Sequence, residues 1–186
     1  METGTIREID LGTFEGFNFR EQGAIERRLT AEEVIGWNHD KEGEAEFWPA
    51  GDNPAVAELF KPGRRVTGSE LEHLAHLLAD AWGYPHEVLL RVHFLVNMQG
   101  EDLRELTALK VEQHDVHLFR GDTFIDVRRA AAFELFELYW PQVYSLWEKT
   151  PLDGLRFDPD EFLDSPGWTV EEVNLGTTKW LLVAAQ

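Results

Sequence analysis

HEVLLRVHFLVNM, residues 86–98, is the stretch on which the expected fold depends. Every second residue from Val88 to Met98 is apolar, and the residues between them are mixed. Strict alternation is typical of a β-strand that has one face on a core. We therefore predict a strand over residues 86–98.

A helix is expected just before this strand, over residues 69–82. Ser69 and Glu72 have the spacing of a capping box, and Gly83 and Pro85 stand where a helix should end. The apolar stripe of the expected helix comprises Leu71, Leu74, Leu78 and Trp82.

The remaining pattern predicts further strands and helices on both sides. Expected strands are residues 5–11, 103–111, 116–119, 168–174 and 178–184, and expected helices are residues 30–37, 54–60, 124–140 (capped by Asp122), 141–149 and a turn after Asp158. Strands that follow one another through short turns favour antiparallel pairing. We therefore predict an α+β fold: a single domain over 1–186, with an antiparallel sheet of five or six strands packed against helices on one face.

The composition constrains the class of partner. The chain has 35 Asp and Glu against 17 Lys and Arg, a net charge of −18 at pH 7. Direct binding of nucleic acid or of an anionic membrane needs basic residues that neutralise phosphate, so we expect neither. A basic protein partner fits the charge. Two other interpretations stay open, because high net charge also keeps a protein soluble and is found in salt-adapted proteins.

The chain contains no cysteine, so disulfides and thiolate metal sites are excluded. The first residues, METGTIREIDLG, lack the basic and apolar regions of a signal peptide, and no apolar run approaches the length of a membrane span. We expect a cytoplasmic protein. The sequence contains no phosphate-binding loop and no serine nucleophile elbow. It therefore shows no catalytic signature, and we expect no cofactor.

An acidic, aromatic loop is expected over residues 38–54. Large aromatic side chains beside carboxylates are suited to anchoring contacts with an Arg- and Lys-rich surface. The candidate partner-binding residues are Trp37, Asp40, Glu42, Glu44, Glu46, Phe47 and Trp48. The competing interpretation is that the tryptophans only attach the loop to the core.

The histidines of the middle third provide an alternative, a metal-dependent enzyme. Imidazole and carboxylate together suit zinc, manganese or non-heme iron. The candidate ligands are His73, His76, Asp80, His114 and His117. Their spacing matches no recognised metal motif, so we expect no stoichiometric metal.

The favoured hypothesis is an acidic, non-enzymatic binding domain of the inhibitor, immunity-protein or DNA-mimic type, because dense negative charge directs association with a cationic site. The alternatives are the metal-dependent enzyme and a small-ligand-binding domain with an aromatic-lined pocket.

Overall fold

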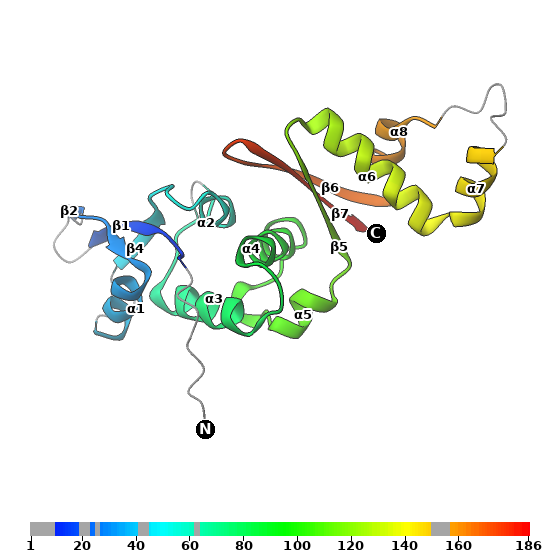
Figure 1. Ribbon diagram of the computed structural model, residues 1–186. Helices are drawn as coiled ribbons and strands as arrows, with labels where there is room; N and C mark the ends of the chain where they lie inside the picture. Colours follow the sequence, from blue (N-terminus) through cyan, green and yellow to red (C-terminus); the bar gives the residue numbers. More distant parts are fainter. Residues whose placement is uncertain (1–9, 19–22, 25–26, 41–44, 62–63, 150–156) are drawn as a thin grey trace. The chain divides into compact units, whose positions relative to one another are not determined.

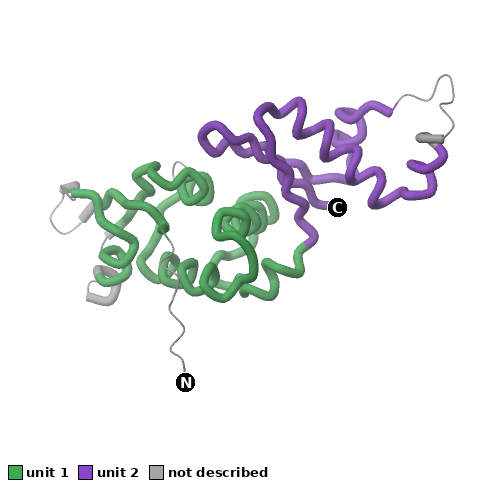
Figure 2. Tube along the Cα trace, in the orientation of Figure 1, with its two compact units in different colours: residues 1–114 green, residues 115–186 purple. Residues whose placement is uncertain are grey.

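The chain forms two compact units, Met1–His114 and Asp115–Gln186 (Figures 1 and 2). The computed structural model describes residues 10–18, 23–24, 27–40, 45–61, 64–149 and 157–186. Each unit has its own antiparallel sheet and its own helices. That residues 1–186 act as a single domain stays a prediction.

The sheet of the first unit is built around β1 (Thr13–Asn18). This strand pairs antiparallel with β2 (Gly23–Ala24), β3 (Leu29–Thr30) and β4 (Ala45–Pro49). The Phe14 and Phe47 side chains of β1 and β4 are buried and form part of the core of this unit.

Helices form the rest of the first unit. They are α1 (Ala31–Asp40), α2 (Pro54–Leu59), α3 (Gly68–Asp80), α4 (Pro85–His93), the π-helical turn η1 (Phe94–Met98), the 3₁₀ turn η2 (Leu103–Glu105) and α5 (Ala108–Gln113). The helices expected at residues 30–37, 54–60 and 69–82 are present as α1, α2 and α3, although α3 already ends at Asp80. The Thr30 hydroxyl accepts a hydrogen bond from the Glu33 amide, and the Glu33 carboxylate accepts one from the Thr30 amide, which completes the capping box of α1.

The predicted strand over residues 86–98 is wrong, because this stretch forms α4 and η1. Its buried side chains belong to both sets of the alternating pattern: Val88, Leu89, Leu90, Val92, His93, Phe94, Leu95 and Val96. A helix that is apolar on nearly all sides loses the contrast between faces that reveals a period of 3.6 residues. Pro85, which we expected to end the preceding helix, instead occupies the first turn of α4, where its missing N–H costs nothing.

Three other local expectations also need correction. The predicted strand over residues 103–111 is the turn η2 followed by α5. The capping box of α3 is formed by Thr67 and Glu70 rather than by Ser69 and Glu72, and Thr123 rather than Asp122 caps the helix at residue 124.

The expected loop over residues 38–54 is only partly a loop. It contains the end of α1 and the whole of β4, because the backbone of Ala45–Pro49 completes the hydrogen bonding of β1. The expected strand at residues 5–11 falls mainly on residues 5–9, which lie outside the described residues.

The second unit matches its expected elements closely. It contains β5 (Val116–Gly121), α6 (Phe124–Tyr139), α7 (Pro141–Lys149), α8 (Pro159–Leu163), β6 (Trp168–Leu175) and β7 (Thr178–Ala185). Strand β7 lies between β5 and β6 and is antiparallel to both, with Leu182 opposite Leu118 and Val183 opposite Val170. Helix α6 packs on this sheet (Figure 1). The core between them comprises Val127, Ala131, Ala132, Leu135, Leu163, Trp168, Leu181 and Val183.

The structure thus confirms a mixed helical and strand fold but corrects its sheet. In the described part of the chain, four strands of the first unit and three strands of the second form separate sheets, not one sheet of five or six strands. Two of the strands expected to join a single sheet, residues 86–98 and 103–111, are helical. Among the described residues, no helix combines the length and apolar character that crossing a membrane requires.

Candidate protein-binding surface

The connection between α3 and α4 presents two large aromatic side chains to solvent. Trp82 is 90% exposed and Tyr84 is 69% exposed. The sequence pattern predicted that Trp82 belongs to the apolar stripe of the helix. However, α3 ends at Asp80, and the backbone of the next residue, Ala81, is extended. Trp82 therefore leaves the helical register that would have turned it toward Leu74 and Leu78.

The backbone of this connection is held by hydrogen bonds at its first two residues. The Ala81 amide donates to the Leu77 carbonyl, and the Trp82 amide donates a 2.6 Å hydrogen bond to the Glu112 carboxylate on α5. Gly83 has a φ of +128°, a conformation that residues with a Cβ rarely adopt. Trp82 is thus exposed on a backbone that α3 and α5 both constrain.

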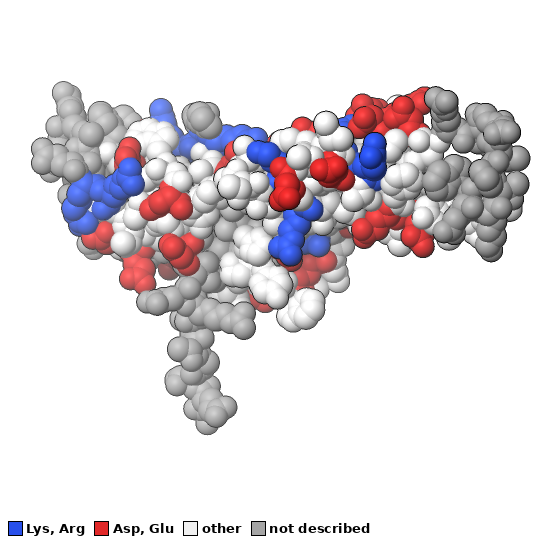
Figure 3. All heavy atoms as spheres, turned by 45° about the horizontal axis from the view of Figure 1, so that its top comes forward, with Lys and Arg blue, Asp and Glu red and all other residues white. Residues whose placement is uncertain are grey.

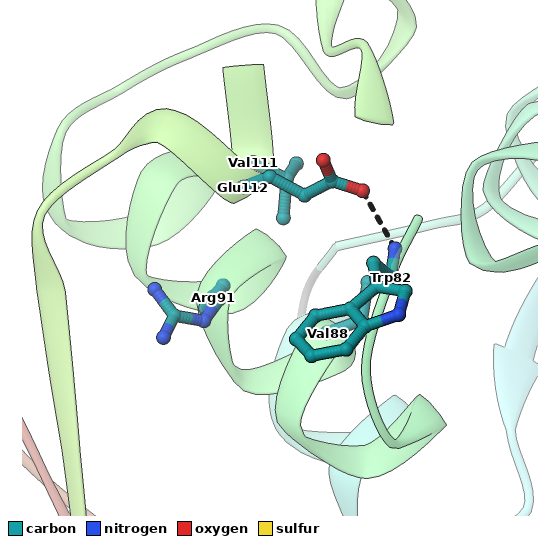
Figure 4. Close-up of a pocket in the computed structure, with 5 residues that line it drawn as sticks. All are labelled: Trp82, Val88, Arg91, Val111 and Glu112. Atoms are coloured by element: carbon teal, nitrogen blue, oxygen red, sulfur yellow. Dashed lines mark hydrogen bonds between the residues drawn. The ribbon is translucent and has the colours of Figure 1, made fainter. Parts of the chain in front are cut away.

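A pocket of about 370 Å³ lies beside the indole ring and is lined by Trp82, Val88, Arg91, Val111 and Glu112 (Figure 4). Val88 and Val111 form its buried apolar part. The Arg91 guanidinium donates a 3.3 Å hydrogen bond to the His114 carbonyl, and the Glu112 carboxylate accepts a hydrogen bond from the Trp82 amide. The pocket therefore combines an aromatic wall, an apolar floor and one group of each charge.

Carboxylates outnumber cations in the chain segments that form this surface. Asp80 ends α3, Glu87 lies in the first turn of α4 and Glu112 lies on α5, and all three side chains reach solvent. Arg91 is the cation that lines the same pocket. We refer to Trp82, Tyr84, Asp80, Glu87 and Glu112 together as the Trp82 surface. Across the face of the molecule in Figure 3, acidic side chains likewise occur in several places with basic ones between them.

The partner-binding residues expected from the sequence are distributed differently. Trp37 and Asp40 lie in α1, Glu42 and Glu44 lie outside the described residues, and Glu46, Phe47 and Trp48 lie in β4. The Glu46 carboxylate forms an ion pair with Arg65, and Phe47 is 1% exposed. Partner binding by this segment stays a prediction, but the burial of Phe47 makes that side chain part of the core.

The candidate metal ligands are not brought together. The ring nitrogen Nε2 of His73 lies 2.9 Å from the Leu106 carbonyl oxygen, while His76 and Asp80 are exposed on α3. His114 contacts Phe94, whereas His117 lies in β5 near Asp115. Within the described ranges, no three His, Cys, Asp or Glu side chains form a group suited to a metal ion.

A signal for the Trp82 surface was present in the sequence. The run Ala81-Trp82-Gly83-Tyr84-Pro85 places a glycine and a proline next to the two aromatic residues. Glycine and proline mark a connection between elements, and connections run over the surface. Trp82 also continues the helical spacing of Leu71, Leu74 and Leu78, so the sequence pattern assigned it to the helix instead.

Comparisons of the chain with protein-family models, with curated protein sequences and with solved structures give no match.

Proposed function

We propose that this chain is an acidic, cytoplasmic protein-binding domain that engages a basic protein partner and does not bind nucleic acid directly. The contact centre is the Trp82 surface. The observation that carries the proposal is the 90% exposure of Trp82 on a backbone that is hydrogen-bonded to Glu112.

Exposed tryptophan is unfavourable for an isolated chain, because its large apolar area contacts water. Tryptophan and tyrosine are also the residues most enriched among those that dominate protein–protein binding energy. Because the amide of Trp82 is already held, its backbone has less freedom to lose on binding, which favours affinity. Trp82 and Tyr84 therefore have the properties of anchors.

The charge of the surface argues for a basic partner. Asp80, Glu87 and Glu112 attract Lys and Arg side chains, and the faces of Trp82 and Tyr84 can receive the same cations. The net charge of −18 adds a long-range attraction that speeds encounter with a cationic protein.

The pocket favours a protein partner over a small ligand. Ligand sites commonly enclose most of the ligand surface within about 300–1,000 Å³. The pocket beside Trp82 is near the lower limit at about 370 Å³, and its aromatic wall is itself 90% exposed. This arrangement suits one side chain of a larger partner.

The test is a quantitative pull-down with the full chain, its Trp82→Ala variant and its Ile125→Ala variant. Ile125 is a matched control because it is 74% exposed and lies in the second unit. We expect Trp82→Ala to lose the basic proteins that the unchanged chain captures, and Ile125→Ala to retain them. Kinetics with a captured partner should show faster dissociation for Trp82→Ala, since anchors act mainly on lifetime.

Two further measurements decide between surfaces. Association should slow steeply with salt, because exposed charges are screened over about 8 Å at physiological ionic strength. If the segment at residues 37–48 is the contact instead, replacing Glu42, Glu44 and Glu46 with Gln will slow association while Trp82→Ala has no effect. Capture that is indifferent to Trp82, to the triple Gln change and to salt would refute the proposed function.

A further inference from the structure

A cluster of three polar side chains lies in the second unit, whereas the Trp82 surface belongs to the first. The Tyr139 hydroxyl donates a 2.7 Å hydrogen bond to Asp115 Oδ2. His117 Nε2 lies 3.2 Å from Asp115 Oδ1 and 3.2 Å from the Tyr139 oxygen. One nitrogen, one carboxylate and one phenol oxygen therefore meet at mutual distances of 2.7 to 3.2 Å.

Local structure explains why the three groups converge. Asp115 and His117 are two residues apart where the chain enters β5, so their side chains project to the same side. Tyr139 is the last residue of α6. Its ring packs edge-on against Trp168, with 5.1 Å between ring centroids, and Phe119 stacks beside His117. Aromatic packing thus fixes the rings of His117 and Tyr139, which carry the nitrogen and the phenol oxygen of the cluster.

We propose that Asp115, His117 and Tyr139 form a binding site for a transition-metal ion of the zinc type. Zinc bonds to nitrogen and oxygen of about 2.0–2.2 Å place neighbouring tetrahedral ligands about 3.3 Å apart. The two 3.2 Å separations from His117 are close to this value, and the 2.7 Å separation between Tyr139 and Asp115 lengthens when the proton between them is lost. The combination of imidazole with oxygen ligands suits such ions. The third ligand is a phenol rather than a histidine or a carboxylate.

Three protein ligands leave a position for water, as in zinc sites that act on substrates. Asp115 is 70% exposed at its side chain, so an ion has access from solvent. The proton that Tyr139 donates to Asp115 must pass to solvent when the phenolate oxygen binds the ion. Because binding of the ion releases this proton, binding should strengthen with pH.

The test is calorimetric titration of the full chain with Zn²⁺ after treatment with a chelator, at about 0.15 M salt to screen unspecific attraction. Variants are His117→Gln, Tyr139→Phe and Asp115→Asn. His76→Gln is the matched control, because His76 is an exposed histidine on α3. Thermal unfolding establishes that each variant is folded.

We expect one Zn²⁺ per chain, binding at least about tenfold weaker in the three variants and unchanged in His76→Gln. Zinc should also produce tyrosinate absorption in the near ultraviolet, which Tyr139→Phe abolishes. The proposal is overturned if no ion binds, if His76→Gln weakens binding as much as His117→Gln, or if the unchanged chain binds zinc without the tyrosinate signal. These outcomes do not depend on the Trp82 surface.

Discussion

The amide of Trp82 donates a 2.6 Å hydrogen bond to the carboxylate of Glu112, thirty residues later in the chain. This contact joins the connection after α3 to α5 and holds the backbone of the most exposed large apolar residue among those described. Glu112 thereby acts on the Trp82 surface in two ways, as a negative charge and as a backbone acceptor.

Two substitutions of Glu112 separate these roles. Glu112→Gln keeps an acceptor oxygen but removes the charge, whereas Glu112→Ala removes both. We expect faster amide hydrogen exchange at Trp82 in Glu112→Ala only, with a loss of about 1 kcal/mol in the free energy of unfolding. If amide exchange at Trp82 is as slow in both variants as in the unchanged chain, the hydrogen bond does not hold this connection.

Phe47 distinguishes a core role from a partner-binding role in β4. It is 1% exposed, so Phe47→Ala should lower the free energy of unfolding by about 3–5 kcal/mol through lost burial and a new cavity. Glu46→Gln, which breaks only the ion pair with Arg65, should cost less than about 1 kcal/mol. Urea unfolding measures both. A stable Phe47→Ala variant that binds partner poorly would instead support the original partner-binding hypothesis.

Arg128 holds three carboxylates together in the second unit. Its guanidinium, 18% exposed, bonds Asp160 at 2.9 Å, Asp164 at 2.6 Å and Glu172 at 3.1 Å. Burial acts to lower the pKa of Arg128, but the hydrogen bonds to the three carboxylates have the larger effect and raise it. The guanidinium therefore stays positively charged.

Replacing Arg128 with Met should lower the free energy of unfolding by about 1–2 kcal/mol, a value reduced by the exposure of the carboxylates. The loss should shrink at high salt, because the remaining repulsion among the three acids is screened. Arg129→Met removes the same charge from an exposed position of α6 and is the control. A loss that is equal in both variants would mean that net charge alone is responsible.

Asp52 should contribute to the acid sensitivity of the first unit. Its carboxylate accepts hydrogen bonds from the Thr13 amide at 2.9 Å and the Thr13 hydroxyl at 2.7 Å. These bonds favour the ionised form and hold the pKa of Asp52 below its ordinary value of 3.8. The stability that they contribute is fully present above that value and is lost as the pH falls through the lowered pKa.

The measurement is urea unfolding of the unchanged chain and of Asp52→Asn between pH 6 and pH 2. We expect the unchanged chain to be more stable than the variant at pH 6, with the difference shrinking only below about pH 4. A difference that stays constant over this range would exclude a contribution from Asp52 ionisation.

Several elements could be predicted from the sequence because their signals are local. The hairpin of β6 and β7 has a turn at Gly176, whose φ is +65°, followed by the apolar run of β7. Helix α6 has one broad apolar face, and Asp158 caps α8 through its own carboxylate. Turn conformation, capping and one-sided burial depend on neighbours close in the chain, so no knowledge of the tertiary structure is needed.

Tertiary structure alone decided the conformation of residues 86–98 and the exposure of Trp82. Burial on almost every side of α4 and η1 made the alternating pattern uninformative, because residues from both sets of positions are buried, Leu89, His93 and Leu95 among them. Trp82 follows the spacing of the apolar stripe of α3, yet the helix ends before this residue. The Glu112 carboxylate accepts the hydrogen bond of the Trp82 amide instead. The meeting of Asp115 and His117 with Tyr139 has the same origin: contacts between residues distant in sequence depend on how α6 packs against the sheet, which no local pattern specifies.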